Sequence, residues 1–243
     1  RFPWNPVVRN ELGRLLREDG DLIAALGVFR EAAAHFPDNA VSRTGLAQTH
    51  FQLNEFNEAL EVFEQACKDF PSNVFFWLGL ASTLRKLDKA ADARKVYEEA
   101  CQAFPSDANS RTGLANILKD AGELDRAEAL FQEARSLDRH NQYAMSGLAE
   151  VWFIKSAKTQ DTALRDSSKS LLQELSDEGV EFAASRLRNY NQKWNLAVER
   201  RGVRYKDLFG EVSEEVVPHL RESPTRTIQE MSAAERLGRA MIA

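Results

Sequence analysis

The residue types that most often carry out catalysis or bind metals are few in this chain and lie far apart. The twelve glycines include no Gly-x-Gly pair, and no Gly-x-Ser-x-Gly sequence is present, so neither a phosphate-binding loop nor a hydrolase nucleophile is indicated. The histidines have no partner at metal-site spacing, and they are His35, His50, His140 and His219. We therefore expect no enzyme activity, no metal and no cofactor.

Two cysteines, Cys67 and Cys101, are 34 residues apart. They are either small core residues in equivalent positions or a redox or metal-binding pair. Packed helices lie about 10 Å apart, which exceeds the reach of a disulfide. We favour the core interpretation, a reducing compartment and a cytoplasmic location.

Composition and charge limit the classes of partner. The chain has 243 residues, 43% of them hydrophobic and 28% charged, which is typical of a folded soluble protein. Residues 1–154 carry 17 Lys and Arg against 23 Asp and Glu, which argues against nucleic-acid binding there. No apolar run approaches the roughly 18 residues of a membrane span, so we expect no membrane partner.

The strongest pattern is a set of residue rows that recur every 34 positions. A period of this length indicates a solenoid of stacked helical hairpins. The rows are Leu46, Leu80, Leu114 and Leu148; Ala25, Ala59, Ala93 and Ala127; Phe29, Phe63, Tyr97 and Phe131; Ala32, Ala66, Ala100 and Ala134; and Pro37, Pro71 and Pro105.

The residues between these rows predict the helix ends. The positions Gly20, Asn54, Asp88 and Gly122 suit a left-handed turn between two helices. The helix N-caps are expected at Asn39, Asn73 and Asp107. A further row, Gly45, Gly79, Gly113 and Gly147, is explained either by first helices that approach one another closely or by a ligand backbone running along the row, and we favour close packing.

The third repeat carries its pattern on Trp77, Leu80, Ala81, Leu84, Asp88, Ala93, Tyr97, Ala100 and Pro105. This spacing resembles the tetratricopeptide repeat family. The resemblance implies an all-α fold, a right-handed α-solenoid of antiparallel helix pairs over residues 1–154. The repeats are expected at 6–39, 40–73, 74–107 and 108–141, with the first helix of a fifth at 142–154. Arg9, Arg43 and Arg111 depart from the family's preferred Trp, and Arg139 departs from its Pro.

In the family, the first helices line a concave groove that binds peptides. Carried over by offset, the predicted groove residues are Asn10, Arg14, Arg17, Thr44, Gln48, Phe51, Leu78, Ser82, Arg85, Thr112, Asn116, Lys119, Ser146 and Glu150. An acidic side chain of the partner is expected at Arg14, Arg85 or Lys119.

Residues 155–243 lose the 34-residue period and are expected to form a helical capping region. We predict a loop over 155–162, a helix over 163–175, a long helix over about 180–200, a short helix over 206–221 and a weakly structured tail. The apolar stripe of the long helix suits either capping of the solenoid or self-association. That stripe is Val180, Ala183, Leu187, Tyr190, Trp194 and Ala197.

A basic cluster accompanies the stripe and is interpreted as a solvated edge. Its members are Arg186, Arg188, Lys193, Arg200, Arg201, Arg204 and Lys206. We predict a non-enzymatic protein–protein interaction scaffold that binds a peptide or partner segment in the groove. The alternatives are a regulatory or sensor module of a larger protein, since the chain starts at Arg1 rather than Met, and polyanion binding through the basic cluster.

Overall fold

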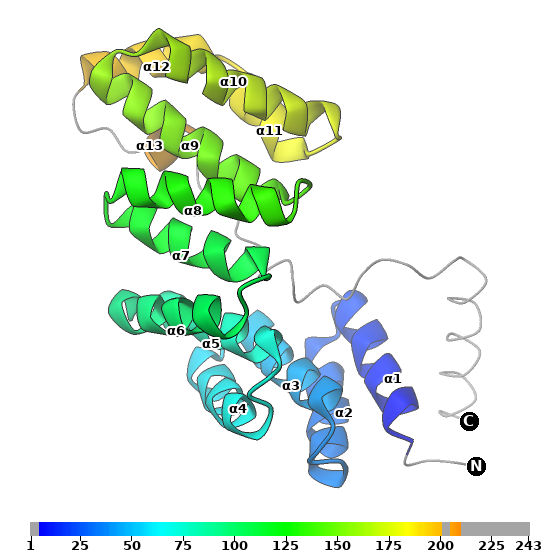
Figure 1. Cartoon of the computed structure of the whole chain (residues 1–243). Helices are drawn as coiled ribbons and strands as arrows, with labels where there is room; N and C mark the ends of the chain where they lie inside the picture. Colours follow the sequence, from blue (N-terminus) through cyan, green and yellow to red (C-terminus); the bar gives the residue numbers. More distant parts are fainter. Residues whose placement is uncertain (1–4, 201–204, 210–243) are drawn as a thin grey trace. The chain divides into compact units, whose positions relative to one another are not determined.

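The computed structural model describes residues 5–200 and 205–209, and all regular structure within them is helical (Figure 1). The chain divides within α6 into two units, each described here by itself. Unit 1 contains α1 (Pro6–Glu18), α2 (Leu22–His35), α3 (Ala40–Gln52), α4 (Phe56–Asp69), α5 (Val74–Lys86) and the start of α6 (Ala90–Ala103). Unit 2 contains the end of α6, α7 (Ala108–Asp120), α8 (Leu124–Leu137), α9 (Gln142–Thr159), α10 (Thr162–Asp177), α11 (Glu181–Leu187), α12 (Tyr190–Glu199) and α13 (Tyr205–Phe209). None of the described helices is long and apolar enough to cross a membrane.

The first four helix pairs have the caps and turns that the sequence predicts. The side chain of Asn39 accepts a hydrogen bond from the Ser42 backbone N–H at 2.9 Å, and that of Asp107 accepts from Ser110 at 2.7 Å. Asn73 caps α5 in the same way. The four predicted turn positions all have positive φ, between 57° and 85°. Helix pairs therefore form from local signals, and consecutive helices pack against each other from α1 to α5 and from α7 to α11.

A ring-on-glycine contact joins each repeat to the next. A Cβ added to Gly79 would lie 2.2 Å from the Phe63 ring, and one added to Gly113 would lie 2.2 Å from the Tyr97 ring. The pairs Phe29–Gly45 and Phe131–Gly147 repeat this contact. The glycine row is thus a packing row, as predicted, although the close neighbour is the aromatic ring of the preceding second helix rather than another first helix.

The three arginines that depart from the family pattern connect the two helices of their repeats. Each arginine in the place of the family's Trp forms an ion pair with an acidic residue on the second helix of its own repeat. The pairs are Arg9–Glu31, Arg43–Asp69 and Arg111–Glu133. A charged contact between the two helices therefore replaces the packing of an indole ring there.

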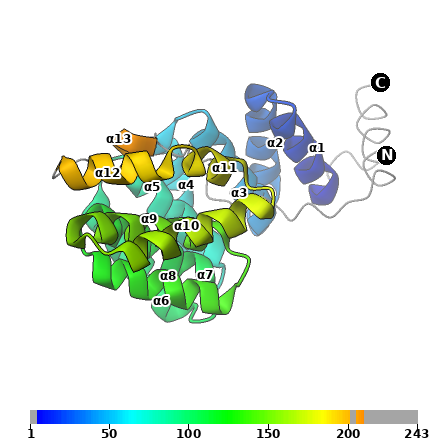
Figure 2. The same cartoon turned by 90° about the horizontal axis from the view of Figure 1, so that it is seen from above.

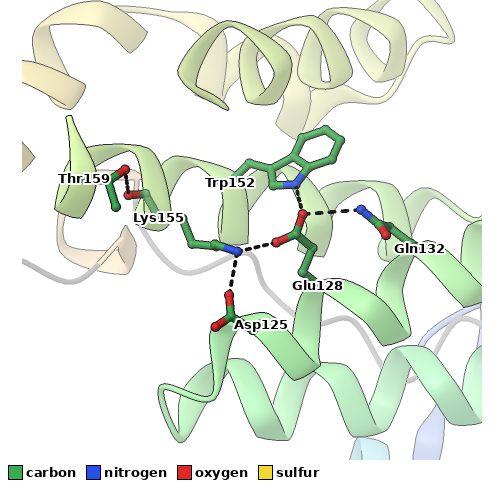
Figure 3. A network of polar contacts seen from close by, with 6 residues as sticks. All are labelled: Asp125, Glu128, Gln132, Trp152, Lys155 and Thr159. Atoms are coloured by element: carbon green, nitrogen blue, oxygen red, sulfur yellow. Dashed lines mark hydrogen bonds and ion pairs between the residues drawn. The ribbon is translucent and has the colours of Figure 1, made fainter. Parts of the chain in front are cut away.

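The loop predicted over 155–162 is wrong, because helix α9 continues to Thr159. Lys155 Nζ donates to Asp125 and Glu128 of α8, each at 2.6 Å (Figure 3). The indole N–H of Trp152 donates to the other oxygen of Glu128 at 2.7 Å. These bonds raise the pKa of Lys155 and lower that of Asp125, chiefly through their mutual hydrogen bond. The extra turn of α9 is held by this network.

The region beyond α9 is helical but differs in detail from the prediction. Helix α10 packs antiparallel on α9 as the second helix of a fifth pair. The long helix expected over 180–200 is two helices, which follow one another in Figure 2. The break falls at Asn189, whose φ is 59°, a left-handed conformation that Asn tolerates. The start of the helix predicted over 206–221 is present as α13, whereas its part beyond Phe209 and the tail lie outside the described residues.

The apolar stripe is buried by the chain itself. Val180, Ala183, Tyr190 and Trp194 are all buried, and the Trp194 indole N–H donates to Ser156 Oγ of α9 at 2.9 Å. Burial raises the pKa of Tyr190 to about 12. The stripe therefore caps the fifth helix pair, and a dimer formed through it would require α11 and α12 to leave α9.

We predict that Gly79→Ala destabilises the protein. The new methyl group must displace a fully buried Phe63 ring, and such overpacking costs about 1–3 kcal/mol, more than the roughly 1 kcal/mol that alanine adds in a helix. Gly27→Ala is the matched control, because nothing lies within 4 Å of its added Cβ. Urea unfolding should show a lower midpoint for Gly79→Ala and a higher one for Gly27→Ala. Two increases would refute the packing role of the row.

We also predict that Lys155→Met lowers stability by about 1 kcal/mol at pH 7, since Glu128 loses its charged donor. Asp125 has a lowered pKa in the fold, so its contribution is present above its unfolded pKa of about 3.9 and is lost as pH falls through the folded value. The difference between variant and wild type should therefore shrink from pH 7 to pH 3. Lys158→Met, at an exposed position of α9, should change neither measurement.

Candidate partner-binding surface

The predicted groove positions share one face of each first helix. They recur as i, i+4 and i+7, as in Thr44, Gln48 and Phe51 of α3, which places them on consecutive turns of the same side. In unit 1, α1 contacts α3 and α3 contacts α5, so their equivalent faces are neighbours. In unit 2, α7 contacts α9 in the same way. The fold thus aligns the faces that the sequence predicts.

Asn10, the first of the predicted groove residues, connects the first repeat to the second. Asn10 Oδ1 accepts a hydrogen bond from Ser42 Oγ at 2.8 Å, and its amide donates to the cap residue Asn39 at 3.2 Å. Asn10 and Ser42 are both buried. Asn10 therefore fastens α1 to the start of α3 and offers little to a partner.

The cations of unit 1 have partners within the chain. Arg17 donates to the side-chain oxygen of Gln48, one repeat further on. Arg14 forms ion pairs with Glu11 and Glu18 on its own helix, and its hydrogen bond to Glu11 raises the pKa of the guanidinium. The acidic anchor expected at Arg14 would have to compete with two carboxylates.

The remaining predicted residues of unit 1 differ in exposure. Leu78 is fully buried, and Phe51 and Ser82 are nearly so. The Phe51 ring packs edge-on against Phe56, with 5.3 Å between ring centroids. Thr44 and Arg85 are half-buried.

An exposed apolar row lies on the same faces and was missed by the sequence reasoning. Val7, Val41 and Phe75 are 70%, 48% and 42% exposed. They share the 34-residue step and lie three residues before the first predicted row, so Val41 and Thr44 are on one side of α3. Phe75 also borders a shallow depression formed by the α4–α5 connection. The 34-residue step was the signal that could have revealed the row.

In unit 2 the predicted residues are also engaged. Lys119 Nζ pairs with Glu150 at 2.9 Å, with both side chains largely buried. Thr112 is buried and donates to the backbone oxygen of Ala108, while Asn116 is half-buried. Ser146 Oγ accepts a hydrogen bond from Arg186 at 2.7 Å. The acidic anchor expected at Lys119 is therefore occupied by Glu150.

Arg186 and Lys193 depart from the solvated edge that the sequence predicts for the basic cluster. Arg186 is only 5% exposed, and Lys193 lies with its Nζ 4.3 Å from the centre of the Phe209 ring. Arg188 and Arg200 are exposed. Arg201 and Arg204 lie outside the described residues, as does the side chain of Lys206.

The described residues contain no group of three or more His, Cys, Asp or Glu side chains that could hold a metal. Both cysteines are free thiols and half-buried, so they lie at the edge of the core rather than inside it as predicted. Burial raises the pKa of Cys67 to about 12 and that of Cys101 to about 11. His50 Nδ1 donates to a Glu55 carboxylate oxygen at 2.7 Å, and the histidine is buried.

Several solved structures are similar to this fold. TTC0263, a thermophilic TPR protein of Thermus thermophilus, has a TM-score of 0.59 at 20% identity, covering 81% of this chain and 100% of that one. YrrB, described as a TPR protein with an unusual peptide-binding site, has a TM-score of 0.51 at 20% identity, over 65% of this chain and 82% of that one. MamA 41-end from Desulfovibrio magneticus RS-1 has a TM-score of 0.55 at 17% identity, over 72% and 94%.

A sequence comparison with curated proteins finds no match. A family profile described as tetratricopeptide repeat matches residues 10–73 and 44–108, and a second profile of the same description matches 84–146. Together they span more than half of the chain, over the residues that form the ring-on-glycine repeats. The chain belongs to the tetratricopeptide repeat family.

Proposed function

We propose that this chain is a non-enzymatic interaction scaffold that captures a protein segment along the first-helix faces of unit 1. The observation that carries the proposal is the exposed row of Val7, Val41 and Phe75. Three apolar side chains at equivalent positions of neighbouring helices form a repeated surface. Such a surface suits a segment with several apolar residues.

The polar residues of the same faces have a supporting role in this proposal. Arg14 is neutralised by Glu11 and Glu18, so the acidic anchor expected there contributes little. Thr44 and Arg85 are half-buried, so part of each side chain is accessible to a bound segment in unit 1. We therefore assign affinity to apolar contacts and orientation to a few polar ones.

The protonation of the two thiols favours a scaffold over an enzyme that uses a cysteine nucleophile. A thiol nucleophile needs a lowered pKa, whereas burial raises the pKa of both Cys67 and Cys101. The described carboxylates and histidines form no metal-binding group. The repeats thus present contacts for a partner and, within the described residues, no assembled nucleophile.

The binding surface can be tested with a peptide-display library of random twelve-residue segments selected on the full chain. We expect the selected peptides to be rich in spaced apolar residues. Their affinity should fall at least about tenfold for Val41→Ser combined with Phe75→Ser, because burying one such side chain contributes about 1.5–3 kcal/mol. Exposed residues are being replaced, so thermal unfolding should barely change.

The matched control is Ile23→Ser, which removes an apolar residue with 70% exposure from the second helix α2. Binding of the selected peptides should be unaffected by this change. An equal loss for Ile23→Ser, or full retention of binding by the double variant, would remove the first-helix faces from the proposal.

The two thiols offer a pH test. With pKa values near 12 and 11, they remain almost entirely protonated at pH 8.5 in the fold, while an unfolded cysteine is already about half thiolate. Alkylation by iodoacetamide at pH 8.5 should therefore be slow and should accelerate after addition of urea. Rapid alkylation of the folded chain would show an activated thiol and would reopen the question of catalysis.

A further inference from the structure

The first-helix face of the fifth repeat has the residues of the second repeat, conservatively changed. Ser146, Glu150 and Phe153 of α9 lie three 34-residue steps after Thr44, Gln48 and Phe51 of α3. Each helix thus presents a hydroxyl, a longer polar side chain and a phenyl ring on consecutive turns. We refer to Ser146, Glu150 and Phe153 as the α9 face.

The chain's own C-terminal helices cover the α9 face. The Phe153 ring meets three other aromatic rings nearly at right angles, those of Tyr190, Tyr205 and Phe209, at centroid distances of 5.1–5.4 Å. Tyr205 and Phe209 are four residues apart in α13, and their rings stack at 4.4 Å. Edge-to-face and offset contacts of this kind stabilise aromatic clusters beyond their buried area.

Two cations also contact the α13 rings. The Arg186 guanidinium carbon lies 5.1 Å from the centre of the Tyr205 ring, while the same group donates to Ser146. Lys193 Nζ lies over the Phe209 ring. Each α13 ring therefore contacts both Phe153 and a positive charge, and the ring quadrupole favours the second contact.

Two buried polar groups nevertheless weaken the packing of α13 on the α9 face. The Tyr205 hydroxyl is buried, and among the described residues it has no hydrogen-bond partner, so burial raises its pKa. Arg186 is buried, and within the described part of the chain no carboxylate forms an ion pair with it. Unsatisfied buried polar groups reduce the stability of the contact that buries them. A five-residue helix has little hydrogen bonding of its own to offset this loss.

We propose that the α9 face is a binding site for a helical segment bearing two aromatic residues four positions apart, and that α13 is its resident occupant, displaced when such a segment binds. The site belongs to unit 2 and is separate from the unit 1 surface proposed above. A partner whose first aromatic residue is Phe, or whose Tyr hydroxyl meets an acceptor, avoids the defect of α13 and displaces it.

The test uses a fluorescent peptide of residues 201–212 and the full-length chain. Wild type should bind the peptide weakly, because α13 competes at the high effective concentration of a tethered segment. Phe209→Ala removes one resident ring, and its affinity for the peptide should be at least about tenfold higher. The same peptide carrying Tyr205→Phe should bind more tightly still.

Matched variants keep the outcome decisive. Gln192→Ala, at an exposed position of α12, should bind the peptide like wild type. Tyr205→Phe in the chain removes the unpaired hydroxyl and should weaken peptide binding below wild type. Phe153→Leu added to Phe209→Ala should abolish the gain. If Phe209→Ala does not fold by circular dichroism, Phe209→Leu replaces it, because it removes the resident ring but keeps an apolar side chain and leaves Lys193 in the site.

The proposal is overturned if the Phe209→Ala chain binds the peptide no better than wild type, because α13 would then be a fixed part of the fold rather than a displaceable occupant of the α9 face. It is also overturned if the gain survives Phe153→Leu, because binding would occur elsewhere. Val41→Ser combined with Phe75→Ser should leave peptide binding unchanged. Failure at the α9 face and failure of the unit 1 surface are therefore distinguishable.

Discussion

The contact between an aromatic ring and a glycine backbone is the constraint on which each unit depends. Because the Phe29, Phe63, Tyr97 and Phe131 rings rest directly on the first helix of the next repeat, no side chain fits at the facing position. This contact fixes the rotation of each first helix, so that positions at i, i+4 and i+7 face the same side in successive repeats. The surface available to a partner is a consequence of that packing, even though the glycines themselves do not belong to it.

The same alignment explains why the predicted polar residues are engaged within the chain. Neighbouring first helices are close enough for a side chain of one to reach the other. The residue that it contacts lies 31 positions later in the sequence. Arg17 reaches Gln48, and Lys119 reaches Glu150 at the same offset. Arg17 and Lys119 therefore connect neighbouring repeats, and this contact competes with any contact that they could make to a partner.

The sequence predicted the parts of the fold that local chemistry determines. Asn and Asp caps, left-handed turns at Gly20 and Asn54, and the small-residue rows each have a physical reason that acts within a few residues. The candidate site was harder to predict than the fold. The spacing of residues along a helix identifies which residues share a face, but it does not identify the side chains that cover that face. Leu78 was predicted to line the groove and is fully buried, whereas exposed Val41, three residues before Thr44 on α3, was overlooked.

The C-terminal region shows the same limit at a larger scale. Apolar residues from Val180 to Trp194 keep helical spacing across Asn189, so periodicity alone predicts one helix, and only the left-handed Asn189 reveals two. Arg186 was expected in solvent because arginines usually lie there, yet its neighbours Phe182 and Tyr205 and the Ser146 hydroxyl hold it inside.

A buried guanidinium held by two rings and one hydroxyl is a poor substitute for an ion pair, and it stays buried only while the rings remain. The rings of α13 in turn depend on the cations beneath them. This mutual dependence makes the docking of α13 cooperative, because losing either group weakens the other. Cooperative docking means that α13 is either fully bound to the α9 face or fully dissociated from it. Complete dissociation is what a partner needs in order to bind the α9 face.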